Sequence, residues 1–157
     1  MSYPDVVKIV EVGPRDGLQN ESVSLDIATK VELIERLANS GLKNIEAGSF
    51  VSPKWVPQMA GSDEVFSQLA PNEAVYAALT PNMRGLERAM ECNVKEVAVF
   101  AAASEAFSEK NINCSIDQSL TKFEAVIQKA SMANISVRGY ISCVAGCPYQ
   151  GDVDNHR

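Results

Sequence analysis

Val7-Lys-Ile-Val-Glu-Val-Gly-Pro-Arg-Asp16 joins a β-branched run to a Gly-Pro turn and a pair of opposite charges. The valines and the isoleucine predict a buried strand over residues 7–12, which Gly13-Pro14 ends. Arg15 and Asp16 then stand just past the carboxyl end of that strand. Parallel α/β proteins place their active sites at this end of their strands. The segment therefore predicts a parallel sheet with a site beside Arg15 and Asp16.

Further apolar runs and helical periodicities alternate along the rest of the chain. Strands are predicted over residues 42–48, 74–79, 94–100 and 135–143, helices over 26–39, 63–69, 80–92 and 116–133, and a loop over 111–115. Asp26 or Ser24 could cap the first helix. Five strands that alternate with helices indicate a parallel sheet with helical crossovers. A doubly wound open sheet and a (β/α)8 barrel both fit this order, although no Gly-x-Gly-x-x-Gly follows the first strand, which disfavours the dinucleotide-binding version.

Composition excludes several classes of function. The net charge of −6 argues against nucleic acid as a partner, because phosphate binding needs a basic surface. No apolar run approaches the roughly 18 residues of a membrane helix. The start of the chain lacks the basic and apolar features of a secretory signal, so we expect a cytoplasmic protein with no membrane partner.

Four cysteines, Cys92, Cys114, Cys143 and Cys147, are expected to be reduced thiols in a chain without a leader. Cys143-x3-Cys147 could be read as half of a zinc site. Such a site needs three or four ligands, and the one histidine, His156, lies outside any ligand spacing. The spacing therefore favours two ordinary thiols.

Two further strands carry polar residues where apolar ones are expected. Glu46 lies inside an apolar strand, where a carboxylate is costly to bury without a partner, so we expect it to point into a site beside Arg15. Period two places Arg138, Tyr140 and Ser142 on one face of the last strand. A loop ion pair at Arg15 and Asp16 and solvent-facing strand residues remain the structural alternatives.

Several long motifs resemble the 3-hydroxy-3-methylglutaryl-CoA lyase family. They are residues 10–21, 49–59, 110–115 and 135–143, extended by Gly146-Cys-Pro-Tyr-Gln-Gly151. The resemblance covers essentially the whole chain. It implies an incomplete domain over residues 1–157, formed by about five βα units from the N-terminal part of a (β/α)8 barrel.

The resemblance also implies roles for individual residues. Asp16 would bind a divalent metal, Mg²⁺ or Mn²⁺, and Arg15 would neutralise the thioester oxygen as it becomes an enolate. Gln19 would orient Arg15, and Glu46 would hold a metal-bound water or the substrate network. The substrate pocket would be lined by Asn111, Arg138 and Tyr140, with Lys54 on its rim.

The implied reaction is metal-assisted retro-Claisen cleavage of 3-hydroxy-3-methylglutaryl-CoA, or a related acyl-CoA, to acetyl-CoA and acetoacetate, as in leucine breakdown and ketone-body formation. The full enzyme is expected to be a homo-oligomer. A whole barrel takes roughly 250 residues, so strands six to eight are expected to be missing, with the family's His-x-His pair, its metal-binding Asn and its Cys-bearing loop. His156 is not the missing ligand, and this chain is expected to be inactive alone.

Two alternatives remain open at this point. One is another acyl-CoA lyase or a Claisen-condensing synthase of the same superfamily, although the motif over residues 49–59 favours a lyase. The other is a half-barrel without catalytic activity that binds a partner or oligomerises, because the expected metal ligands are absent.

Overall fold

The computed structural model describes residues 3–154, so the expectation for His156 lies outside the described residues. Four parallel strands form one sheet in the order β1-β2-β3-β4: β1 (Asn44–Ser49), β2 (Val75–Leu79), β3 (Glu96–Ala102) and β4 (Ser136–Ser142). The helices are α1 (Ile27–Asn39), α2 (Ser62–Gln68), α3 (Met83–Glu91), α4 (Glu105–Ile112) and α5 (Ile116–Met132). This alternation confirms the predicted α/β class with parallel crossovers.

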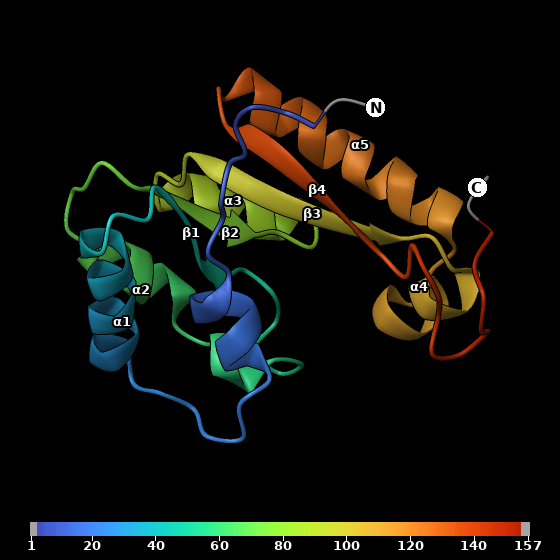
Figure 1. Cartoon of the computed structure of the whole chain (residues 1–157), viewed down its shortest axis with the longest axis horizontal. Coiled ribbons are helices and arrows are strands. Elements are labelled where there is room, and N and C mark those ends of the chain that lie inside the picture. Colours follow the sequence, from blue (N-terminus) through green and yellow to red (C-terminus); the bar gives the residue numbers. More distant parts are fainter. Residues whose placement is uncertain (1–2, 155–157) are drawn as a thin grey trace.

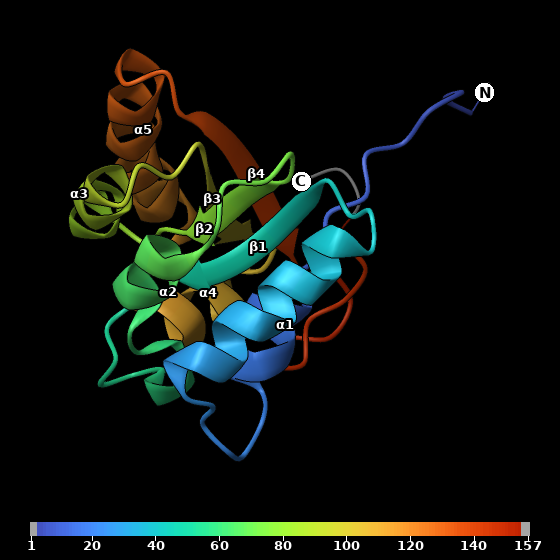
Figure 2. The same cartoon turned by 90° about the vertical axis from the view of Figure 1, so that its left-hand side faces the viewer.

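The helices cover one face of the sheet in two groups. The helices α1 and α2 pack against β1, where Ile34 and Ile45 are fully buried, and Figure 2 shows α1 lying along this strand. The helices α3 and α5 pack on β2, β3 and β4 around a second cluster that includes Leu86, Val97 and Val126. Figure 1 shows α5 running along β4. The helices therefore leave the other sheet face free for polar residues.

The helix ends follow from caps that are visible in the sequence. Asp26 accepts a hydrogen bond from the Thr29 amide at the start of α1, and Asn82 does the same for Gly85 in α3. At α5, Ser115 and Gln118 form a reciprocal capping box. The four predicted helices are thus confirmed to within a few residues, and Asp26 rather than Ser24 caps the first.

The strand predicted over residues 7–12 is wrong as a regular strand. Only Glu11 pairs, forming a parallel bridge to Ile45 through backbone bonds with Asn44 and Glu46 of 2.9 and 2.8 Å. Val7 and Ile9 are 70% and 67% exposed, and Figure 1 shows the segment running as a plain coil across the sheet. Their apolar side chains remain exposed to solvent, so the β-branched sequence pattern did not by itself produce a ladder of strand hydrogen bonds.

Three helical segments were not predicted: Gly13–Gly17, the 3-10 turn Pro57–Met59 and α4. Gly13–Gly17 forms one turn of π-helix directly after the Glu11 bridge. The predicted loop over residues 111–115 begins inside α4, so Asn111 is helical. Ser104 caps α4 by accepting from the Phe107 amide, but the helix has only weak amphipathic periodicity, which explains why it escaped the pattern.

Candidate active site

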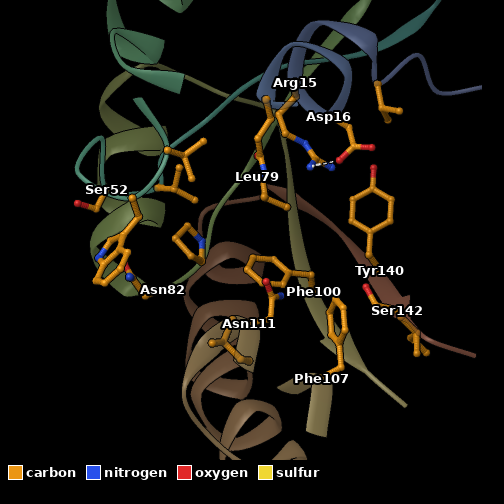
Figure 3. A pocket seen from close by; sticks show the side chains of 18 residues that line it. Arg15, Asp16, Ser52, Leu79, Asn82, Phe100, Phe107, Asn111, Tyr140 and Ser142 are labelled. Atoms are coloured by element: carbon orange, nitrogen blue, oxygen red, sulfur yellow. Dashed lines mark hydrogen bonds and ion pairs between the residues drawn. The ribbon is translucent and has the colours of Figure 1, made fainter. Parts of the chain in front are cut away.

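A cavity of about 650 Å³ opens at the carboxyl ends of the strands. Figure 3 shows Arg15 and Asp16 on one side of it, Tyr140 and Ser142 from β4 on another, and Asn111 and Phe107 from α4 below. This is the end of the sheet where the first segment of the sequence predicted a site.

Glu46 organises the polar face of the sheet. Its side chain has no exposed surface, and it accepts hydrogen bonds from Arg15 Nε, from Arg138 at 3.0 Å and from the Tyr140 hydroxyl at 2.7 Å. A carboxylate that is cut off from water is tolerated only when such donors replace its hydration. The burial of Glu46 is therefore explained by three partners from two distant segments.

Arg15 is buried between two carboxylates. Its Nε donates a hydrogen bond to Glu46, and its Nη1 lies 2.8 Å from Asp16 Oδ1. Its guanidinium carbon lies 5.9 Å from the centre of the Tyr140 ring, within range of a cation–π contact. The π-helical turn places Arg15 here, and Glu11 Oε1 steadies the start of that turn by accepting from the Gly13 amide at 2.6 Å. The cation at the cavity wall is thus held from several sides.

The ionic contacts continue along the sheet away from the cavity. Arg138 bridges Glu46 and Glu96, with its second nitrogen 2.9 Å from Glu96, and Lys8 reaches the same carboxylate at 2.8 Å. Alternating charges therefore cross the polar face from Lys8 to Asp16. This row lies on the sheet face that the helices leave free, and Glu46 and Arg138 stand behind the cavity wall.

Tyr140 stays protonated across the ordinary pH range. Burial, the hydrogen bond to Glu46 and the charge of that carboxylate together raise the pKa of Tyr140 to about 12, while Arg138 and Arg15 oppose the shift. The hydroxyl is therefore a fixed donor to Glu46, and its ring faces the cavity.

The structure brings together Arg15, Asp16, Glu46, Arg138 and Tyr140, but Arg138, which was expected to line the substrate pocket, lies behind Glu46 and is not part of the cavity lining. Asn111 lines the same cavity from α4. Gln19 also lines it, but its buried amide oxygen meets no donor among residues 3–154, so Glu46 rather than Gln19 holds Arg15. Lys54 is exposed and is not part of the cavity lining.

Several lining residues were not singled out from the sequence, among them Trp55, Asn82, Phe100 and Phe107. Trp55 is 86% exposed beside the cavity, which is unusual for the largest apolar side chain and lies inside a motif already quoted. That tryptophan in a loop was a usable signal, whereas the two phenylalanines read as ordinary core residues.

The described residues do not form a metal site by themselves. Asp16 is half exposed and faces the cavity, but no group of three His, Cys, Asp or Glu side chains within residues 3–154 could hold an ion. A divalent cation needs several oxygen or nitrogen ligands. One carboxylate that is already paired with Arg15 supplies only part of such a set.

Comparison with known proteins identifies the family. The HMGL-like family model matches residues 6–156. The chain belongs to the HMGL-like family. This HMGL-like chain is 61% identical over 155 residues to a 3-hydroxy-3-isohexenylglutaryl-CoA/hydroxy-methylglutaryl-CoA lyase of Pseudomonas aeruginosa. The aligned region covers 98% of this chain and 52% of that protein.

Solved structures of the HMGL-like family share the fold. A hydroxymethylglutaryl-CoA lyase from Pseudomonas aeruginosa matches with a TM-score of 0.92 and 60% identity over 96% of this chain and 51% of its own. A lyase from Acinetobacter baumannii in complex with coenzyme A and 3-methylmalate matches with a TM-score of 0.91 and 32% identity over 99% and 51%. The chain thus spans about half the length of the relatives it matches, and its sheet is part of a (β/α)8 barrel.

Proposed function

We propose that this chain forms the N-terminal part of the active site of a carbon–carbon lyase, which cleaves 3-hydroxy-3-methylglutaryl-CoA to acetyl-CoA and acetoacetate. The observation that carries the proposal is the 61% identity to the Pseudomonas aeruginosa lyase over nearly the whole chain. The site supports it, because Arg15 presents a fixed cation to a cavity at the carboxyl ends of the strands.

The proposed reaction needs a cation where charge develops. Loss of the C3 hydroxyl proton breaks the C2–C3 bond and leaves the electron pair on the thioester as an enolate. Arg15 lies in the cavity wall, where its guanidinium can contact the enolate oxygen. Glu46, which also accepts a hydrogen bond from Tyr140, holds Arg15 in place. Preorganised donors of this kind contribute about 3–4 kcal/mol to a transition state.

Glu46 and Arg138 are assigned positioning roles in this proposal. Neither lines the cavity: Glu46 contacts Arg15 and Tyr140, whereas Arg138 contacts Glu46 and the Tyr140 ring. Asn111 and Tyr140 contribute to the substrate-binding wall. Asp16 is the one ligand that we assign to a divalent cation, Mg²⁺ or Mn²⁺, and the remaining ligands would come from the part of the relatives' length that this chain does not span. No catalytic step is assigned to the cation.

The test uses the full-length protein that carries this sequence. Incubation with 3-hydroxy-3-methylglutaryl-CoA and Mg²⁺ should release acetoacetate, and Arg15→Gln should lower kcat about 10²–10³-fold. The matched control is Arg36→Gln, which removes an exposed arginine of α1 that pairs only with Glu32 among the contacts described, and it should leave the rate unchanged. Absence of acetoacetate, or equal losses in both variants, contradicts the proposal.

A larger acyl chain is a second candidate substrate. The Pseudomonas aeruginosa relative is also named for 3-hydroxy-3-isohexenylglutaryl-CoA, and Trp55, Phe100 and Phe107 give this cavity an apolar wall. The ratio of kcat/KM for the two esters decides between them. Consumption of acetyl-CoA with a 2-oxo acid would instead indicate a condensing synthase.

Three expectations for the whole protein stay predictions. They are a homo-oligomeric enzyme, a cytoplasmic location and a role in leucine breakdown. Among residues 3–154, no helix combines the length and apolar character needed to cross a bilayer.

A further inference from the structure

A buried lysine outside the cavity binds the loop that forms one of the cavity walls. Lys30 of α1 is only 7% exposed, and its ammonium donates to the backbone oxygens of Gln58 and Ala60 at 2.6 and 3.2 Å. Lysine is rarely so buried without a carboxylate partner, yet no ion pair within residues 3–154 includes Lys30. Burial accordingly lowers the pKa of Lys30. The buried charge is therefore placed where it binds backbone carbonyls.

These carbonyls belong to the loop over residues 50–61, which joins β1 to α2. The loop contains the 3-10 turn Pro57–Met59, and the last carbonyls of a helical turn have no partner inside the turn. Lys30 binds the first and third of three successive carbonyls, and the Ser62 hydroxyl donates to the middle one, that of Met59, at 2.9 Å. Two buried side chains thus hold the end of the loop.

The first half of the same loop lines the cavity. The lining residues from this loop are Val51, Ser52, Trp55 and Val56. Figure 3 shows Ser52 on the side of the cavity opposite Tyr140. Lys30 is not part of the lining, so it can affect a bound molecule only through the loop that it holds.

The loop is also joined to the segment that carries the cation of the site. The side-chain amide of Gln58 donates to the backbone oxygen of Glu21 at 3.0 Å, six residues after Arg15. Lys30 binds the backbone of Gln58, and Gln58 in turn binds this segment. The contacts of Lys30 and Gln58 therefore fix the loop relative to the Arg15 side of the cavity.

We propose that Lys30 is a positioning residue, which fixes the loop over residues 50–61 as a wall of the cavity and so sets the affinity for the acyl-CoA ester. The inference rests on the proposed lyase function. Arg15 is held separately by Glu46, so a loosened loop leaves the cation of the reaction in place. Loss of the Lys30 ammonium should therefore raise KM more than it lowers kcat.

The test combines hydrogen exchange with steady-state kinetics on the full-length protein that carries this sequence. Lys30→Met keeps an unbranched apolar side chain but removes the donors. Exchange in the peptide over residues 50–61 should become at least about ten-fold faster, while exchange in the α5 peptide stays the same. KM for 3-hydroxy-3-methylglutaryl-CoA should rise at least about five-fold, with kcat changed by less than about two-fold.

The matched control is Lys43→Met, which makes the same replacement at an exposed lysine that pairs with Glu73. It should leave both the loop exchange and KM unchanged. A second variant, Gln58→Ala, removes the bond to Glu21 and leaves the buried ammonium in place, so it also serves if Lys30→Met does not fold. It should speed loop exchange and raise KM by about two- to three-fold.

Three results would overturn the proposal. One is loop exchange in Lys30→Met that stays unchanged or rises no more than exchange in α5. Another is a fall in kcat at unchanged KM, and the third is a Gln58→Ala variant that matches the unmodified protein in both measurements. If the unmodified protein releases no acetoacetate, the lyase function fails, whereas hydrogen exchange still decides whether Lys30 holds the loop.

Discussion

Glu46 holds a negative charge on the sheet's polar face with no exposed surface, and two arginines and a tyrosine depend on it. Replacing it by glutamine keeps the shape but leaves the charges of Arg15 and Arg138 without this partner. Breaking a buried ion pair from one side costs about 3–5 kcal/mol. Glu46→Gln should therefore lower the free energy of unfolding by about that amount. Urea unfolding transitions of both proteins, recorded at the same protein concentration, measure the difference.

The matched control is Glu73→Gln. Glu73 pairs with Lys43 at 2.6 Å, but both side chains are largely exposed. Exposed pairs contribute under about 1 kcal/mol. Equal losses of stability in the two variants would contradict the central role given to Glu46.

Tyr140 predicts an alkaline limit to stability. Its pKa is about 12 in the folded chain, above the value of roughly 10 for an unperturbed tyrosine. The folded state therefore holds its proton more tightly, and the resulting stability is complete below about pH 10 and is lost as the pH rises toward 12. An ultraviolet titration should show one late phenol, which Tyr140→Phe removes. A late phenol that persists in Tyr140→Phe would contradict the assignment, with Tyr76, whose pKa burial also raises, as the other candidate.

At the scale of elements, α5 tests whether local signals hold a helix in place. Ser115 and Gln118 form a capping box, and removing the serine oxygen leaves a backbone amide without its partner. Ser115→Ala should destabilise the chain by about 1 kcal/mol. Thr121→Ala, on the exposed side of the same helix, should change stability by less than about 0.5 kcal/mol, measured by the same urea transitions. Indistinguishable variants would mean that packing alone holds α5.

The elements also show where patterns in the sequence succeed. The capped and periodic helices α1, α3 and α5 were predictable, because their start signals and apolar stripes agree. Helix α4 has an N-terminal cap but little apolar periodicity. Residues 7–12 have β-branched side chains, but they form only one bridge, between Glu11 and Ile45 of β1. In both cases the outcome depended on what lies alongside in space.

At the scale of the whole molecule, β4 leaves one side of the sheet open. It pairs only with β3 among the described strands, and Ile141 on it is 65% exposed. An apolar hollow of about 910 Å³ beside it is bordered by β3, β4 and the Leu120 and Ile127 side chains of α5. Unpaired apolar edges template association. A polypeptide of residues 1–157 should therefore self-associate, seen as a scattering mass that rises with concentration.

Ile141→Lys should reduce this association, since a charge on an edge strand opposes pairing. Thr121→Lys adds the same charge to the exposed side of α5 and should leave association unchanged. A well-dispersed monomer of the unmodified chain with a cooperative unfolding transition would contradict the argument from the open edge.

Local chemistry along the chain was sufficient to predict the parallel α/β class, most helix ends and the need of the Glu46 carboxylate for a partner. These signals are the alternation of side chains along a strand, the capping side chains of helices and an acidic residue in an apolar strand. Each depends only on residues that are close in sequence, so each can be recognised from the sequence alone. The cavity wall formed by Trp55, Phe107 and α4, and the pairing of Arg15 with Glu46 instead of Gln19, depended on segments that are distant in sequence. Contacts between distant segments depend on which apolar surfaces and which hydrogen-bond donors are still without a partner after the local elements have formed. Only the packing of the whole chain in three dimensions determines this.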